Sequence, residues 1–353
     1  MVIGGGFAGL TTALAFRHVH PRPPIVLIEP RERFVFVPLL YELLSGELKG
    51  WEVAPTYASL LQGRGISHVQ DHVQSVDLKA RTLKTASAQT MTYSQLVIAT
   101  GAQPTDFGIP GVRDHALRFH TLSDLAPLQQ CLQQVRRRPS GSSTLVIAGA
   151  GATGVELACK LFDMLDGAAA IQLVELGERI LSRSRAFNRE QAQQALQKRG
   201  ITVRLNTRVD AVTPTSVNLN GAEGALTLAH DGLIWTAGSR PKIPDLTPAV
   251  TLQGGRLPVT SALRLEGHPE VMALGDIVTH SSDDEASNWP LSAQAAIQQG
   301  QFAAKCLQSH LKGSDPGPFI FRDLGEMLSL GIGDASLTGL GIKIGRASCR
   351  ERV

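Results

Sequence analysis

The feature that most constrains the fold is a glycine-rich loop between an apolar strand and a helix. Its first copy is Gly4-Gly5-Gly6-Phe7-Ala8-Gly9, which follows a short apolar segment and leads into a helical stretch. A second apolar strand at 25–28 ends in Glu29, 20 residues after Gly9. Strand, glycine turn, helix, strand and distal acid together are typical of a unit that binds a dinucleotide.

Each part of this loop has a physical reason. Gly4 permits the tight turn, Gly6 lets the backbone approach a pyrophosphate, and Gly9 lets the helix and strand pack closely. The N-terminus of the helix offers unpaired N–H groups and a positive dipole end to the phosphates. Glu29 is expected to hydrogen-bond a ribose hydroxyl.

The same unit occurs again 145 residues further along the chain. Gly149-Ala150-Gly151-Ala152-Thr153-Gly154 follows one apolar strand, and the next strand, 171–174, ends in Glu175. Two such units predict an α/β protein with two Rossmann-like domains that binds two dinucleotides. Glu175 favours NADH over NADPH because its charge repels a 2′-phosphate, an effect that Arg179 is expected to offset in part.

The composition excludes several other classes of protein. Hydrophobic residues make up 43% of the chain and charged residues 18%, as in ordinary globular proteins. The four cysteines form no C-x-x-C pair, so we predict neither a disulfide framework nor a metal site. Residues 344–353 contain three arginines and one glutamate and so account for +2 of the formal charge of +3. Because the rest of the chain is nearly neutral, we expect no nucleic acid partner.

Both ends of the chain depart from the natural pattern. Only three residues precede Gly4, whereas a strand usually has about five, so a few N-terminal residues are expected to be missing. We find neither a signal peptide nor an apolar stretch of about 20 residues that would cross a membrane. Residues 344–353 resemble a translated sequencing adapter and are predicted to be non-native.

Three further motifs, in the expected order, resemble those of the two-dinucleotide flavoprotein reductases. LVIATG at 96–101 resembles their strand-end motif beside FAD, and LIWTAG at 233–238 resembles the closing strand of their nicotinamide domain. MALGD at 272–276 resembles the motif whose aspartate holds the ribityl chain of FAD. The resemblance implies the pyridine nucleotide-disulfide oxidoreductase-like fold, with three layers in the order ββα.

That resemblance also implies the domain organisation. The FAD-binding domain is discontinuous and comprises residues 1–115 and 262–317, and the NAD(P)H-binding domain comprises residues 116–261. Residues 318–343 are expected to be the start of a truncated C-terminal region that contacts the membrane and the quinone.

Within this superfamily, the chain most resembles the type II NAD(P)H:quinone dehydrogenases, which are single-subunit enzymes that pump no protons. Residues 33–42 resemble their flavin-facing loop, and residues 291–300 resemble the AQxAxQQG motif at their quinone pocket. The disulfide of the lipoamide and glutathione reductases and the reactive cysteines of the sulfide-quinone oxidoreductases are missing. The resemblance implies hydride transfer from NAD(P)H to FAD, and then transfer of two electrons to a membrane quinone.

A narrower resemblance points to the cyanobacterial and plastid branch of demethylphylloquinone reductases. It rests on the segments 43–48, 51–55 and 321–327. It implies a prenylated naphthoquinone as the electron acceptor.

The resemblance implies three sets of site residues. The FAD site comprises Gly4, Gly6, Phe7, Ala8, Gly9, Glu29, Pro38, Leu39, Thr100, Gly101, Gly275, Asp276 and Ala295. The NAD(P)H site comprises Gly149, Gly151, Ala152, Thr153, Gly154, Glu175, Ala237 and Gly238. The catalytic residues are Glu156, Gln294 and Gln298.

The three catalytic assignments each have an alternative. Gln294 and Gln298 are four residues apart, so they project from one helical face, where neutral amides hydrogen-bond a quinone carbonyl. The alternative is a polar, solvated helix face. Glu156 positions the dihydronicotinamide or relays a proton, or else it simply complements the dipole at the start of its helix. The N-terminus of the 291–300 helix is expected to stabilise the anionic reduced flavin.

The family reaches the membrane through C-terminal amphipathic helices. We therefore expect the full-length protein to lie peripherally on the cytoplasmic face of a plasma or thylakoid-like membrane, and the chain as given to bind membranes weakly. A homodimer is compatible with this reading. Two other functions stay open: a soluble reductase that serves a ferredoxin- or rubredoxin-like protein, and a non-catalytic flavin redox sensor.

Overall fold

The computed structural model describes residues 1–16, 23–281, 289–311, 313–314 and 317–345. The chain divides into two compact units. Unit 1 comprises Met1–Val35, Ala54–Gln103 and Arg240–Arg322, and unit 2 comprises Phe36–Val53, Pro104–Ser239 and the chain from Asp323 onward. These bounds differ from the predicted domains, since 36–53 and 104–115 group with unit 2 and 240–261 group with unit 1. Each unit contains one of the two glycine loops.

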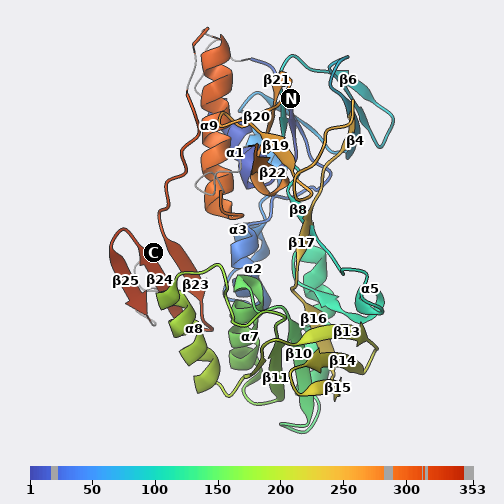
Figure 1. Ribbon diagram of the computed structural model, residues 1–353, viewed down its shortest axis with the longest axis vertical. Helices are drawn as coiled ribbons and strands as arrows, with labels where there is room; N and C mark the ends of the chain where they lie inside the picture. Colours follow the sequence, from blue (N-terminus) through green and yellow to red (C-terminus); the bar gives the residue numbers. More distant parts are fainter. Residues whose placement is uncertain (17–22, 282–288, 312, 315–316, 346–353) are drawn as a thin grey trace. The chain divides into compact units, whose positions relative to one another are not determined.

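Unit 1 is built on an eight-stranded sheet in the order β22-β19-β20-β21-β7-β1-β2-β3. The strands from β21 to β3 in this order are parallel neighbours, and helices α1 and α9 lie side by side (Figure 1). One hydrophobic core joins the main sheet, α9 and the small sheet β18-β4-β5-β6, which confirms the predicted α/β fold class with ββα layers.

The elements of unit 1 have these bounds: β1 Val2–Ile3, α1 Phe7–Ala15, β2 Ile25–Ile28, α4 Tyr57–Leu61, β3 Ile66–Val69, β4 Val73–Asp77, β5 Thr82–Thr85, β6 Thr90–Thr92, β7 Leu96–Ile98, β18 Asp245–Thr247, β19 Leu257–Val259, β20 Arg264–Leu265, β21 His268–Ala273, β22 Val278–His280 and α9 Ala293–Leu311. Two short strands, β8 Ala102–Pro104 and β17 Ser239–Pro241, pair with each other.

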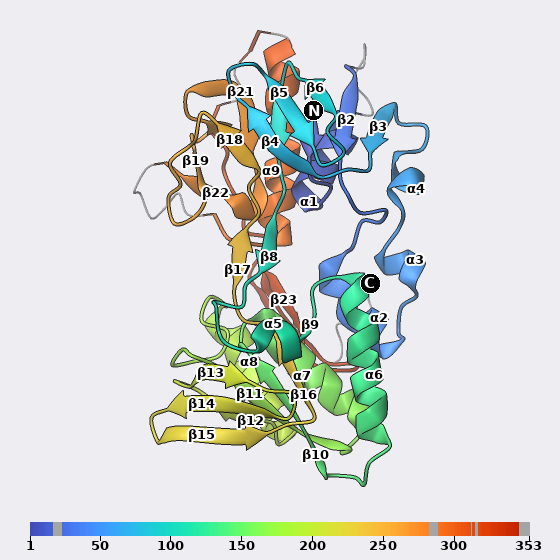
Figure 2. The ribbon, with the colours of Figure 1, turned by 90° about the vertical axis from the view of Figure 1, so that its right-hand side faces the viewer.

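Unit 2 contains a parallel five-stranded sheet in the order β12-β11-β10-β16-β9. Figure 2 shows the antiparallel strands β13, β14 and β15 as a separate meander. The elements are α2 Leu40–Ser45, α3 Gly50–Val53, α5 Val112–His115, β9 Leu117–Arg118, α6 Leu125–Arg136, β10 Ser143–Ala148, α7 Ala152–Leu165, β11 Ala169–Val174, α8 Ala186–Lys198, β12 Thr202–Arg204, β13 Arg208–Val212, β14 Ser216–Gly221, β15 Gly224–Ala229 and β16 Gly232–Trp235.

The chain after unit 1 folds as an antiparallel sheet of β23 Glu326–Ser329, β24 Ala335–Gly339 and β25 Ile342–Gly345. Its inner face buries Leu328, Ser336 and Thr338, and Asn188 of α8 hydrogen-bonds both hydroxyls. Ile344 and Gly345, the first two residues of the predicted non-native tail, belong to β25. The rest of that tail, including Cys349, lies outside the described residues.

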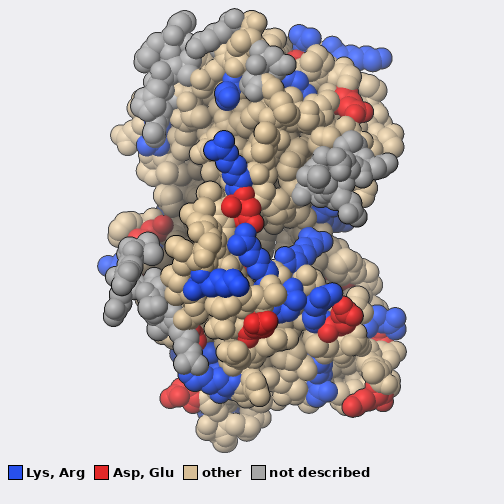
Figure 3. Space-filling view, turned by 60° about the vertical axis from the view of Figure 1, so that its left-hand side comes forward, with Lys and Arg blue, Asp and Glu red and all other residues tan. Residues whose placement is uncertain are grey.

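On the face drawn in Figure 3, Lys and Arg side chains are interspersed with Asp and Glu. No helix within the described ranges is both long and apolar enough to cross a bilayer. Cys131, Cys159 and Cys306 are buried.

Candidate dinucleotide sites

The first glycine loop connects β1 to α1 and has the geometry expected of a phosphate-binding turn. Gly4 has a φ of 93°, and a Cβ added to Gly9 would lie 1.9 Å from the Gly4 carbonyl oxygen, so neither position accepts a side chain. At Gly6, by contrast, an added Cβ would meet open space beyond its chain neighbours. Gly6 is also the N-cap of α1 and offers no side chain to its first N–H groups, which leaves them for an anionic ligand.

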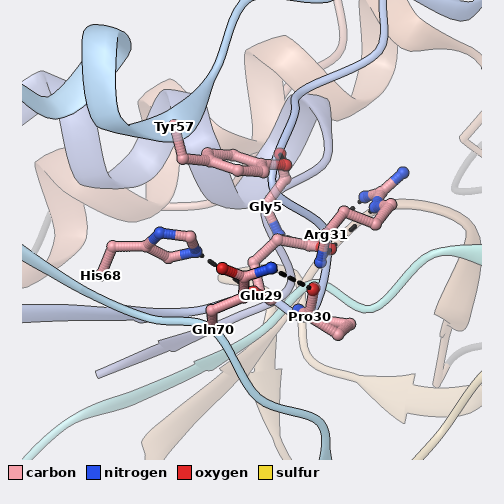
Figure 4. Close-up of polar contacts among 7 residues, drawn as sticks. All are labelled: Gly5, Glu29, Pro30, Arg31, Tyr57, His68 and Gln70. Carbon is pink, nitrogen blue, oxygen red and sulfur yellow. Dashed lines mark hydrogen bonds and ion pairs between the residues drawn. The ribbon is translucent and has the colours of Figure 1, made fainter.

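Glu29, at the end of β2, holds this loop in place (Figure 4). Its carboxylate accepts hydrogen bonds from the Gly5 amide at 2.7 Å and from the Arg31 side chain at 2.7 and 3.1 Å. Only 3% of Glu29 is exposed. Burial disfavours its charge, but the hydrogen bonds and charge of Arg31 and the Gly5 amide outweigh burial and lower the pKa of Glu29. Tyr57 covers the loop from α4 and donates to the Gly5 carbonyl at 2.8 Å.

The second glycine loop, between β10 and α7, repeats this construction. A Cβ on Gly154 would lie 1.8 Å from the Gly149 carbonyl oxygen, and the space around Gly151 is open. Gly151 is the N-cap of α7 and again contributes no side-chain hydrogen bond. Glu175 accepts from the Ala150 amide at 2.6 Å and from the Gly177 amide at 2.8 Å. Both loops therefore fit a dinucleotide pyrophosphate.

Arg179, predicted to offset the charge of Glu175, instead lies 2.9 Å from the carboxylate of Glu178. Both side chains of that pair are more than half exposed. Such a surface pair contributes little to stability.

The strand-end motifs lie beside the loops in their own units. In unit 1, the Gly4 turn packs against the carbonyl of Ala99, next to Thr100 and Gly101. In unit 2, Gly149 packs against Ala237, and the Thr236 hydroxyl donates to the Gly149 carbonyl at 3.0 Å. The structure thus brings each predicted motif to its own glycine loop. Gly238, next in the second motif, packs on Phe107.

The third motif joins the first loop through α9. Gly275, next to Asp276, approaches Ala8 of α1, and its amide donates to Gln299 at 2.6 Å. Gly300 packs directly on the Ala8 backbone, because an added Cβ would lie 2.5 Å from that carbonyl oxygen. Sequence reasoning missed Gln299, which is buried and holds the Gly275 turn.

The two glutamines assigned to the quinone differ in their surroundings. The Gln298 amide both donates to the Arg322 carbonyl at 2.8 Å and accepts from the Arg322 amide at 2.9 Å. These two hydrogen bonds to the backbone give Gln298 a structural role that sequence reasoning did not anticipate. Gln294, one turn earlier on α9, is half-buried, and Ala295 beside it is buried. The helix begins at Ala293, and the hydroxyl of Ser292 accepts from the Ala295 amide.

The predicted flavin-facing loop divides between the two units. Phe34 belongs to unit 1, where its ring packs edge-on against Phe7. Pro38 and Leu39 form a 3-10 turn that belongs to unit 2. The remaining NAD(P)H residues, Ala152 and Thr153, open helix α7.

Glu156 lies in the first turns of α7, among polar groups from three elements. Its carboxylate accepts from the Ser329 amide of β23 at 2.8 Å, and Tyr41 of α2 lies within hydrogen-bonding reach. Burial raises the pKa of Glu156 to about 7, and the charge of Glu42 adds to this, against the Ser329 and Tyr41 hydrogen bonds and the charge of Lys160. A carboxyl that titrates near neutral pH is suited to exchange protons.

Unit 1 also has a cavity of about 630 Å³ that sequence reasoning did not anticipate. It is lined by Thr100 together with His72, Lys84 and Lys242, among others. Burial and the charge of Lys242 lower the pKa of His72. Apart from Thr100, which belongs to the 96–101 motif, no motif marks these residues, because they come from separate strands and loops that only the fold brings together.

Comparison with known proteins identifies the family. The family model described as pyridine nucleotide-disulphide oxidoreductase matches residues 1–300. The chain belongs to this pyridine nucleotide-disulphide oxidoreductase family. It is 37% identical to the demethylphylloquinone reductase NdbB of Synechocystis over 97% of this chain and 87% of that protein. It is 32% identical to the alternative NAD(P)H-ubiquinone oxidoreductase C1 of Arabidopsis thaliana, over 96% and 72% of the two chains.

The fold is also similar to that of a solved structure. NDH2 from Plasmodium falciparum, solved in complex with NADH, superposes with a TM-score of 0.86 at 17% identity, over 98% of this chain and 91% of that one. The predicted resemblance to type II quinone dehydrogenases, and within them to demethylphylloquinone reductases, is confirmed by these relatives.

Proposed function

We propose that this chain is an FAD-dependent NAD(P)H:quinone oxidoreductase that acts on a naphthoquinone. The observation that carries the proposal is the pairing of two dinucleotide loops, one in each unit, in a chain 37% identical to a demethylphylloquinone reductase over nearly its whole length. The loop at 4–9 binds FAD, and the loop at 149–154 binds the nicotinamide dinucleotide. FAD supplies the chemistry that accepts hydride and passes on two electrons.

The residues of the chain bind and orient the reactants and move one proton. Glu29 and Glu175 shape the two loops, and Glu175 favours NADH by repelling a 2′-phosphate. Gln294 donates an N–H to a quinone carbonyl, while Gln298 fixes the backbone at Arg322 by two hydrogen bonds. Glu156 holds a proton near the nicotinamide.

An anaerobic two-step experiment tests this function. Purified holoenzyme is reduced by NADH in a stopped-flow instrument, and the bound flavin is then reoxidised by menadione, by ubiquinone-1 or by ferredoxin. We expect rapid flavin bleaching and faster reoxidation by menadione than by the other two. Faster reoxidation by ferredoxin would favour the reductase of a protein partner, and slow turnover with every acceptor would favour a redox sensor.

We also propose that the protein associates peripherally with the membrane that holds the quinone. The outer side of the β23–β25 sheet supports this, because Met327 is 64% and Ile342 55% exposed there, and Leu340, in the turn between β24 and β25, is 80% exposed. Weak, salt-sensitive flotation with anionic liposomes is expected, and Met327→Ser should lower it. The predicted cytoplasmic location and homodimer stay predictions.

A further inference from the structure

Helix α7 carries a lysine that is completely buried. The Lys160 side chain is 0% exposed, and its Nζ lies 2.6 Å from Glu47 Oε2 and 3.8 Å from Glu42 Oε1. Both glutamates come from α2 and the turn that follows it. A buried ammonium is tolerated only with such partners. The two carboxylates therefore fix Lys160 against α2.

This ion cluster adjoins Glu156. Lys160 is four residues after Glu156 on α7, so the two side chains project from the same face of the helix. From α2, Tyr41 and Glu42 also face Glu156. The Tyr41 hydroxyl donates to the Thr153 carbonyl at 3.5 Å, and Tyr41 as a whole is buried.

The charges of the cluster are unbalanced. Glu42, Glu47 and Glu156 present three carboxyls to the single ammonium of Lys160. The Glu42 Oε2 atom is buried and has no hydrogen-bond partner among the described residues. A proton on Glu156 reduces the excess of negative charge, whereas the ammonium of Lys160 favours the ionised form.

We propose that Lys160 and Glu42 are positioning residues with opposite electrostatic effects on Glu156. Together they determine the pH at which Glu156 takes up and releases its proton, and Glu47 weakens the effect of Lys160 by pairing with it. This inference rests on the proposed function of the chain. Reduction of a quinone to its quinol takes two electrons and two protons. NADH supplies one hydride, which is two electrons and one proton, and becomes NAD⁺. The second proton comes from Glu156, which is recharged from solvent.

The titration of Glu156 agrees with this arrangement. Its pKa is raised to about 7, so the carboxyl is protonated below and ionised above neutral pH. The groups that face it are Tyr41 and Glu42 of α2, Lys160 and Cys159 of α7, and the Ser329 amide. Burial raises the pKa of Cys159 to about 12, so this thiol stays neutral.

The test is the pH profile of flavin reoxidation by menadione in the NADH-reduced holoenzyme. Glu42→Gln removes a repelling charge and should lower the midpoint of the profile by about one pH unit. Glu47→Gln frees the charge of Lys160 and should shift it in the same direction. Lys160→Met should raise the midpoint, and Lys160→Arg should restore it. The opposite signs separate an electrostatic role from a merely structural one.

Controls make each result decisive. Glu52→Gln, an exposed change on α3, should leave the midpoint in place. If Lys160→Met does not fold, the two glutamine variants of the α2 region decide the question. Unchanged midpoints in Glu42→Gln and Glu47→Gln, or shifts of one sign in all three variants, overturn the proposal. Failure of wild-type protein to reoxidise with any quinone instead overturns the proposed function itself.

Discussion

The two glycine loops share one plan but differ in how firmly each is held. In both, the distal glutamate accepts a hydrogen bond from the amide of the second loop residue, Gly5 in one and Ala150 in the other. In unit 1, Glu29 is also clamped by Arg31, and Tyr57 lies on the loop. In unit 2, the bonds of Glu175 are to backbone amides.

This difference matches the roles proposed for the two units. A loop fixed by an ion pair and covered by an aromatic ring is suited to a resident cofactor. Among the described residues, the acid of the second loop is held by backbone amides alone and is half-buried. Such a loop is suited to a nucleotide that enters and leaves at each turnover. The following predictions test this contrast, from the largest expected effect to the smallest.

The largest effect is expected at the closest contact in each loop. Gly9→Ala and Gly154→Ala each place a Cβ within 2 Å of a carbonyl oxygen, so the loop must shift. Such overpacking costs about 1–3 kcal/mol or more. Gly9→Ala should yield colourless protein, and Gly154→Ala should keep its flavin but lose reduction by NADH. Visible absorption and stopped-flow reduction check both, with Gly50→Ala, which meets open space, as the control. Loss of flavin in both variants would contradict the proposal that the first loop binds FAD and the second binds the nicotinamide dinucleotide.

The second effect concerns the clamp on Glu29. Glu29→Gln leaves the Arg31 charge without its partner and should cost about 1.5–3 kcal/mol of unfolding free energy at neutral pH. Since the pKa of Glu29 is lowered, its contribution is complete above the ordinary glutamate range and disappears as the pH falls through the lowered value. The gap between wild type and variant, measured by urea unfolding, should therefore close only in strong acid. A gap that does not vary with pH would rule out this electrostatic contribution.

The third effect, on the preference for NADH over NADPH, is smaller because Glu175 is only half-buried and solvent screens its charge. Glu175→Gln keeps an acceptor for the Ala150 amide but removes the charge that repels a 2′-phosphate. The preference for NADH over NADPH in kcat/KM should fall by roughly tenfold, since exposed charges are screened. Glu178→Gln, at the exposed neighbouring pair, is the matched control. An unchanged ratio would mean that other residues select the nucleotide.

The smallest effect is expected from the ring over the first loop. Tyr57→Phe removes one buried hydrogen bond to the Gly5 carbonyl, worth about 1 kcal/mol. The release of flavin should quicken about fivefold, the factor for that energy. Tyr93→Phe removes a longer bond, 3.4 Å to the Asp77 carbonyl in the same unit, and should change the release rate little. Equal effects from both would assign the change to general stability.

The sequence by itself determined the fold class, the two loops and their acids. Glycine turns, strand periodicity and the spacing to Glu29 and Glu175 are local properties, since each follows from backbone conformation within about 30 residues. The strand-end motifs and the family were also readable from the chain alone.

Only the tertiary structure decided which side chains meet. Three contacts join residues from separate elements. They are the hydrogen bond of Tyr57 to the first loop, those of Gln298 to the Arg322 backbone, and the ion pairs of the buried Lys160 with two glutamates. Sequence spacing places Gln298 on a helical face but says nothing of what that face touches. Burial and charge pairing depend on long-range packing, which no local pattern encodes.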